Sequence, residues 1–287
     1  METRELRYFI AVAEESHVGR AAQRLGMAQP PLSRAVARLE RRIGAELFVR
    51  SPRGMTLTSA GQTLLREGRA ALAAVEAAER RTRRTIAAGG RAPVVLTAKA
   101  GASGELMARL LDEYAADVDA VDVEVVLSPP GHQAHMLRDG RADVAILHQP
   151  FDDISGFDVD VLRVEDQVLV LPASHPTSRA TSLTVADARS IPDLPPPRWP
   201  RLDGTYPEGP GPELRDLTQV LQLVRLGRAS IMLPESSRAS LGDGLTVVPV
   251  TDAAQVTTVI AWPPQSVSPG VAGLVRAAER LGDLSTV

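Results

Sequence analysis

Two adjacent prolines, Pro30 and Pro31, interrupt a segment whose other residues favour helix. Proline is tolerated in the first turn of a helix, because its missing N–H would have no intrahelical partner there. The segment is therefore predicted to form two helices, over about 20–25 and about 29–43. Gly26 follows the first, as glycine often does at a helix C-terminus, so the turn between them is short.

The second of these helices is predicted to have one apolar and one cationic face. Its apolar residues recur at i, i+4, i+7 and i+11, and they are Leu32, Val36, Leu39 and Ile43. The opposite face is small, polar and positively charged, and it consists of Gln29, Pro30, Ser33, Arg34, Ala37, Arg38 and Arg41. With an upstream stripe over 6–13, these segments predict a helix-turn-helix that binds DNA. An ordinary αα-hairpin in a small bundle is the alternative.

Charge is distributed unevenly along the chain. Residues 1–90 carry a net charge of +7, whereas residues 91–287 carry −10. A basic N-terminal third on an acidic remainder indicates a nucleic-acid-binding module joined to a second function. A solvated basic helix face is the alternative.

Two short strands are predicted next, around 47–49 and 55–57, with SPRG as the turn between them. This pattern predicts a wing, with Arg50 and Arg53 placed to contact phosphates or the minor groove.

Residues 4–61 resemble the winged helix-turn-helix of the LysR-type transcriptional regulators. The resemblance is carried by AA-x-x-L-x-x-x-QP-x-x-S, followed by LE, G, LF-x-R and LT-x-x-G. It implies that base edges or the nearby backbone are met by Gln29, Pro30, Ser33 and Arg34. The family usually has serine at position 17, and Ser or Thr at position 19 as the N-cap of the helix predicted over about 20–25. Here His17 and Gly19 occupy these positions, and glycine is the weaker cap.

Residues 59–88 lack proline and predict one long helix. Leu65, Leu72, Glu79 and Ile86 are spaced by seven, a weak seam that allows a helix–helix dimer. A single surface helix is the alternative. Beyond a hinge at 87–93, strand and helix segments alternate, which favours a parallel α/β sheet.

The order of these later segments resembles the LysR-type effector domain, which has two α/β lobes of periplasmic-binding-protein type around a cleft. MLRDGRADVAIL, LVLPASHP and LVRLGRASIMLPES carry this resemblance. We therefore expect a DNA-binding domain over 1–60, a linker helix and hinge over 61–90, and an effector-binding domain over 91–287. Within the last, the first lobe is expected over about 91–163 and 264–287, and the second over about 164–263.

Candidate ligand-binding residues follow from the strand ends, since ligands bind beyond the carboxyl ends of strands in open α/β sheets. Lys99 and Ser103 follow the first strand beside a helix N-terminus, which attracts anions. Ser128 and His148 end the next two strands. Each also has a purely structural alternative, such as Lys99 pointing to solvent or His148 capping a strand.

Eight prolines between Ile191 and Pro212 exclude the additional helix that the family usually has there. We expect instead an extended loop along or over the cleft. Arg198 and Trp199 on this loop are further candidates for effector binding.

Several other classes of protein are excluded or disfavoured by the sequence. The absence of cysteine excludes disulfides, thiol redox sensing and cysteine-ligated zinc. No signal peptide or membrane span is visible, so we expect a cytoplasmic location. GASGE is not a G-x-S-x-G elbow, and no P-loop or dinucleotide-binding glycine pattern is found. We expect no enzyme activity, no catalytic residues, no metal and no cofactor.

The resemblance implies a sequence-specific transcriptional regulator that grips a promoter dyad in double-stranded DNA as a homodimer, with two dimers commonly joining as a homotetramer. A small-molecule effector of unknown identity in the cleft would modulate DNA binding or bending, and the resemblance allows RNA polymerase as a further partner. Two alternatives are an enzyme or solute-binding α/β body fused to a DNA-binding head, and an architectural DNA binder with an empty cleft.

Overall fold

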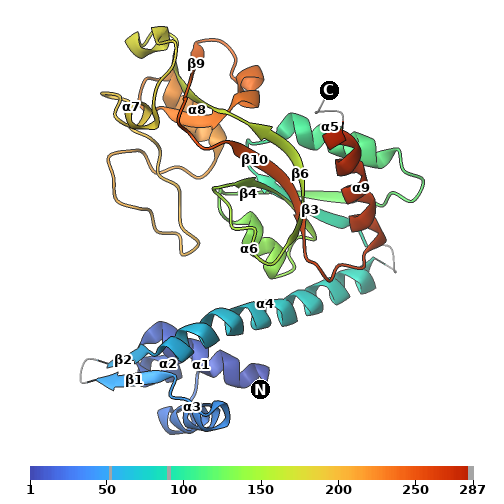
Figure 1. Ribbon diagram of the computed structural model, residues 1–287. Coiled ribbons are helices and arrows are strands. Elements are labelled where there is room, and N and C mark those ends of the chain that lie inside the picture. The colour runs from blue at the N-terminus through green and yellow to red at the C-terminus, as the bar shows by residue number, and fades with distance from the viewer. Residues whose placement is uncertain (52–53, 89–91, 284–287) are drawn as a thin grey trace. The chain divides into compact units, whose positions relative to one another are not determined.

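The computed structural model describes residues 1–51, 54–88 and 92–283 (Figure 1). The chain forms two compact units that divide near residue 82. We call them the N-terminal unit, residues 1–82, and the C-terminal unit, which holds most of residues 83–287. Among the described residues, no helix is long and apolar enough to cross a membrane.

The N-terminal unit is a three-helix core with a wing and a long final helix. Its elements are α1 (Thr3–Glu15), α2 (Val18–Arg24), α3 (Gln29–Ile43), the antiparallel pair β1 (Phe48–Ser51) and β2 (Gly54–Leu57), and α4 (Ser59–Ala87). Leu32, Val36 and Leu39 of the predicted apolar stripe of α3 are buried in one core with side chains of α1 and with Leu47. Ile43, the last residue of that stripe, is 42% exposed at the end of α3 and does not join this core. Pro30 and Pro31 lie in the first turn of α3, which confirms the two-helix prediction.

The start of α2 corrects the expected capping residue. The N-cap is His17, not Gly19, and its imidazole Nδ1 accepts hydrogen bonds from the backbone N–H groups of Gly19, at 3.0 Å, and Arg20, at 3.2 Å. A Cβ atom on residue 19 would lie 2.9 Å from Cε1 of His17. The two departures from the family pattern therefore form one arrangement, because the histidine cap needs glycine beneath its ring.

Helix α4 uses part of its predicted dimer seam within its own unit. Leu64, Leu65 and Leu72 pack against the core of the N-terminal unit. Further along the helix, Val75 and Ile86 remain 46% and 75% exposed. The first four turns of α4 therefore complete the winged-helix core, while Val75 and Ile86 beyond them stay exposed.

The first lobe of the C-terminal unit is a five-stranded sheet with the order β4-β3-β5-β10-β6. Its strands are β3 (Val94–Lys99), β4 (Val123–Ser128), β5 (Val144–Gln149), β6 (Asp158–Glu165) and β10 (Val256–Trp262). The core on one face is built with α5 (Gly104–Ala115) and α9 (Pro269–Asp283), and that on the other with α6 (Gln133–Arg138) (Figure 1).

The second lobe is a three-stranded antiparallel sheet with the order β8-β7-β9. Its strands are β7 (Gln167–Pro172), β8 (Ile231–Pro234) and β9 (Leu245–Pro249). They pack with α7 (Val185–Arg189) and α8 (Leu217–Arg225), and short 3-10 turns lie at η1 (Pro176–Arg179) and η2 (Glu235–Ser240).

Two expectations about the lobes need correction. The prediction of a parallel sheet holds for β3 with β4 and β5, but β10 runs antiparallel to both β5 and β6. The expected second lobe, 164–263, also wrongly included β10. Val259, Ile260 and Ala261 of this strand are fully buried between β5 and β6, so the strand completes the core of the first lobe.

Candidate DNA-binding face and ligand cavities

The exposed face of α3 carries positive charge that the described residues do not neutralise. Arg34 and Arg38 lie one turn apart and are exposed, and neither forms an ion pair with a described residue. Three other arginines of the unit are paired: Arg24 and Arg69 lie 2.8 and 2.7 Å from Glu14, and Arg42 lies 2.8 Å from Glu5. We call the outer side of α3, around Arg34 and Arg38, the cationic face.

The first turn of α3 adds polar groups to this face. Gln29 and Pro30 are exposed, and Ser33 is half-buried one turn after Gln29. Ala28, the N-cap, has no capping side chain, and the two prolines remove two of the four N–H groups that lack helical partners. The open N–H groups and the helix dipole attract phosphate, while Arg and Gln side chains can pair with base edges in a major groove.

The wing is fixed to α3 by hydrogen bonds from its backbone to a carboxylate side chain. Glu40 of α3 accepts hydrogen bonds through Oε1 from the N–H groups of Leu47, at 2.9 Å, and Phe48, at 3.3 Å. Arg50 pairs through its backbone with Met55, but its side chain lies outside the described residues, as does Arg53. The predicted wing contacts of these two arginines therefore stay predictions.

A cavity of about 630 Å³ in the C-terminal unit is lined by both lobes. The first lobe contributes Lys99, Ser103 and His148, and the second contributes Trp199 and residues of β8 and η2. This volume lies in the range of small-molecule sites. The structure therefore brings four of the six predicted effector-binding residues to one cavity.

Buried polar contacts join the first-lobe residues of this cavity. The Lys99 ammonium lies 2.7 Å from Oδ2 of Asp152, with the two side chains 13% and 3% exposed. The same carboxylate oxygen accepts a 2.7 Å hydrogen bond from the backbone N–H of His148. His148 Nε2 and the Ser103 hydroxyl lie 2.9 Å apart, while Nδ1 of His148 is buried without a hydrogen-bond partner. Because Asp152 already pairs with Lys99, the predicted cation for an anionic ligand is neutralised by the chain itself.

This environment shifts two ionisation equilibria. Burial lowers the pKa of His148, and the nearby Lys99 adds to that effect, while Asp152 opposes it. Burial raises the pKa of Asp152, but its contacts with His148 and Lys99 outweigh this, so its pKa lies below the usual value. The arrangement favours a neutral imidazole beside a Lys99–Asp152 ion pair.

Two predicted effector residues lie away from the cavity lining. The Ser128 hydroxyl is buried and accepts a 2.8 Å hydrogen bond from Nε2 of Gln133. Arg198 instead holds the proline-rich loop together, because its guanidinium donates to the carbonyl oxygens of Gly211, at 2.6 Å, and Pro207, at 2.8 Å. It also lies 3.1 Å from Glu213. Both therefore serve the local structure rather than the cavity.

Sequence reasoning also missed cavity residues. Asp152 follows β5 by three residues, and no periodicity distinguishes it from the neighbouring Asp153. Arg163 and Glu165 lie on β6, 3.7 Å apart, and also line the cavity. Among the described residues, no group of three or more His, Asp or Glu side chains could hold a metal ion.

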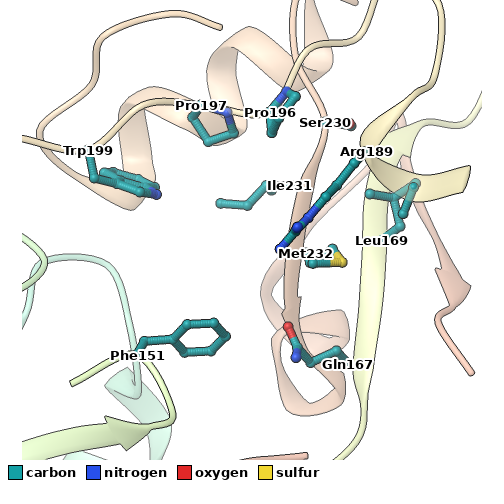
Figure 2. Close-up of a pocket in the computed structure, with 11 residues that line it drawn as sticks. Phe151, Gln167, Leu169, Arg189, Pro196, Pro197, Trp199, Ser230, Ile231 and Met232 are labelled. Atoms are coloured by element: carbon teal, nitrogen blue, oxygen red, sulfur yellow. The ribbon is translucent and has the colours of Figure 1, made fainter. Parts of the chain in front are cut away.

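A second, smaller cavity of about 180 Å³ lies beneath the proline-rich loop, largely within the second lobe (Figure 2). It shares Phe151, Trp199, Ile231 and Met232 with the larger cavity. Pro196 and Pro197 of the loop also line it, and so does Arg189 at the end of α7. The loop that replaces the expected helix thus lines a compartment adjoining the main cavity.

Comparison with known families matches both units. Residues 3–62 match the family described as bacterial regulatory helix-turn-helix protein, lysR family, and residues 87–282 match the LysR substrate binding domain. Among curated proteins, the chain is 35% identical to the regulator AlsR of Bacillus subtilis (strain 168) over 204 residues, covering 70% of this chain and 67% of AlsR. It is 32% identical to the regulator BudR of Raoultella terrigena over 276 residues, covering 91% and 94%.

Solved structures give the same fold. The LysR family regulator CbnR aligns with a TM-score of 0.55 and 23% identity, over 98% of this chain and 99% of CbnR. Full-length CbnR bound to its target DNA aligns with a TM-score of 0.50 and 25% identity, over 98% and 100%. The relatives are named transcriptional regulators, not enzymes. The chain therefore belongs to the LysR family of bacterial transcriptional regulators, with an N-terminal DNA-binding domain and a C-terminal effector-binding domain.

Proposed function

We propose that the cationic face of α3 enters the major groove of a promoter dyad, with Gln29, Ser33 and Arg34 reading bases. The observation that carries this proposal is the exposed positive charge of Arg34 and Arg38, which no described carboxylate neutralises. A buried or paired arginine would have to break its contacts before it met DNA. These two are available without that cost.

The proposal includes assembly of the regulator as a homodimer that joins into a homotetramer in the cytoplasm, where RNA polymerase would be a further partner. The exposed apolar side chains of Val75 and Ile86 on α4 support a helix–helix contact between copies. Two copies of α3 would then face the two half-sites of a dyad.

The effector would act from the large cavity, without a resident cofactor. Both lobes line that cavity, and only Asp166 separates β6 of the first lobe from β7 of the second. A ligand that contacts both lobes has a different affinity for their open and closed arrangements, and it can shift the balance only through that difference. Such a shift would change the DNA binding or bending of the assembled regulator.

The DNA-binding part is tested by fluorescence anisotropy with the full chain and a labelled fragment from upstream of its own gene. We expect Arg34→Ala to weaken binding by about fivefold to 150-fold, the effect of losing one good base or phosphate contact. Arg66→Ala is the matched control, since Arg66 is an exposed arginine on α4 whose ion pair among the described residues is with its neighbour Glu67.

Salt dependence provides a second readout of the same experiment. Log K should fall linearly with log salt, because phosphate contacts release counterions. A slope near zero, or equal affinity in Arg34→Ala and wild type, would contradict the proposed role of the cationic face.

A further inference from the structure

The smaller cavity is lined by an arginine without an ion-pair partner among the described residues, whereas the lysine of the larger cavity is neutralised by a carboxylate. Arg189 is the charged residue among those that line it, and it makes no ion pair with a described residue. Figure 2 shows its side chain reaching from α7 toward the space between Phe151, Gln167 and Ile231. In the larger cavity, by contrast, Lys99 is paired with Asp152. The unneutralised cation of this region is therefore on the wall of the smaller cavity.

Two other polar side chains that line the smaller cavity already donate hydrogen bonds within the chain. Nε2 of Gln167 donates to the carbonyl oxygen of Ala254 at 2.7 Å, and the Ser230 hydroxyl donates to that of Leu194 at 2.9 Å. Both residues are buried. For a negatively charged ligand group, Arg189 is the charged donor of this lining, and its planar guanidinium can pair with a carboxylate through two hydrogen bonds.

The rest of the wall suits a small apolar group. Phe151 and Trp199 place aromatic rings on one side of the space, with Ile231 and Met232 beside them (Figure 2). The volume of about 180 Å³ limits the ligand, since an apolar cavity of about 150 Å³ accommodates benzene. A single ring is therefore about the largest group that fits.

We propose that this cavity binds a small organic carboxylate with one aromatic ring or a group of similar size. Its carboxylate pairs with Arg189, and its apolar part packs against Phe151 and Trp199. Phe151 follows β5 of the first lobe, whereas Arg189 and Trp199 belong to the second, so the ligand contacts both lobes. The inference rests on the proposed effector role of the lobes and names the chemical class of the effector.

The test uses benzoate and its uncharged counterpart benzamide as probes. The chain has two tryptophans, Trp199 and Trp262, and the second lies on β10. In full-length Trp262→Phe protein, the tryptophan fluorescence therefore reports on Trp199 alone. We expect a saturable change in emission with benzoate, and binding at least about tenfold weaker for benzamide, because benzamide lacks the charge-assisted contact.

Two further variants in this background isolate the guanidinium. Arg189→Gln should weaken benzoate binding by about tenfold or more and leave benzamide binding unchanged. Arg179→Gln is the control, since Arg179 is an exposed arginine of η1 in the same lobe and lies outside the cavity lining. Arg189→Lys, which keeps the charge without the planar fork, should give intermediate binding.

Three results would overturn the inference: no saturable response to benzoate, equal affinity for benzoate and benzamide, or equal loss of benzoate affinity in Arg189→Gln and Arg179→Gln. Far-ultraviolet circular dichroism of each variant verifies folding. This assay contains no DNA. If benzoate fails to bind while the wild-type chain binds its promoter fragment, the ligand class alone is refuted. If the wild-type chain does not bind the promoter fragment, the proposed function is refuted.

Discussion

The histidine cap of α2 gives a quantitative prediction about the DNA-binding domain. Loss of an N-cap side chain costs about 1 kcal/mol, within a range of about 0.5–2. His17→Ala should reduce the local stability of α2 by this amount, because the N–H groups of Gly19 and Arg20 lose their acceptor. The change removes no residue of the cationic face.

The effect of Gly19→Ala on the stability of α2 should depend on the residue at position 17. Alanine is better than glycine in a helix by up to about 1 kcal/mol. With His17 present, however, the new Cβ would lie 2.9 Å from the ring, so the imidazole must move and lose its cap contacts. Gly19→Ala should therefore give little or no gain in wild type but stabilise α2 in the His17→Ala background.

The double-mutant cycle should give a coupling energy of about 1 kcal/mol between positions 17 and 19. Hydrogen exchange of the α2 peptides in the full chain measures this, and 1 kcal/mol corresponds to about a fivefold change in exchange rate. Gly104→Ala at the start of α5 is the control, because nothing lies within 4 Å of its added Cβ. If the two single changes at 17 and 19 add to within about 0.3 kcal/mol, the proposed steric link is refuted.

Two further predictions concern the C-terminal unit. Burial lowers the pKa of His148, so the unfolded chain takes up a proton first as the pH falls below about 6.5, and the folded unit loses stability in that range. Thermal unfolding should show the melting temperature falling between about pH 6.5 and 5, less steeply in His148→Gln; equal slopes would contradict this. Arg198→Ala should accelerate hydrogen exchange in the loop over 196–214 by about tenfold or more, because it removes charge-assisted bonds to Gly211 and Pro207. The same exchange rate in the exposed-arginine control Arg201→Ala would show that Arg198 does not hold the loop.

Local patterns in the sequence were sufficient to predict the helices and the wing of the DNA-binding domain. Pro30 and Pro31 define where α3 begins, its apolar spacing defines the buried side, and the turn sequence marks the wing. These signals depend on residues close in sequence, so the helices and the wing can be predicted without knowledge of tertiary contacts. The exception is the cap, because the pairing of His17 with Gly19 depends on the rotamer of an imidazole.

The C-terminal unit was less predictable because its decisive contacts are long-range. β10 joins β5 and β6 from more than 90 residues away, and its apolar pattern suits a strand of either lobe. Asp152 was missed because only the fold brings its carboxylate to Lys99. Arg198 was assigned to the ligand because its loop was expected along the cleft, yet nearby carbonyl groups use its donors.

The central claim, that the cationic face of α3 reads a promoter dyad, is tested most directly by a nuclease footprint. The full chain would be footprinted on the DNA upstream of its own gene, beside Arg34→Ala and the control Arg66→Ala. We predict a protected dyad with wild type and with Arg66→Ala, and its loss with Arg34→Ala at the same protein concentration. Diffuse protection, or a dyad protected equally by all three proteins, would contradict the claim.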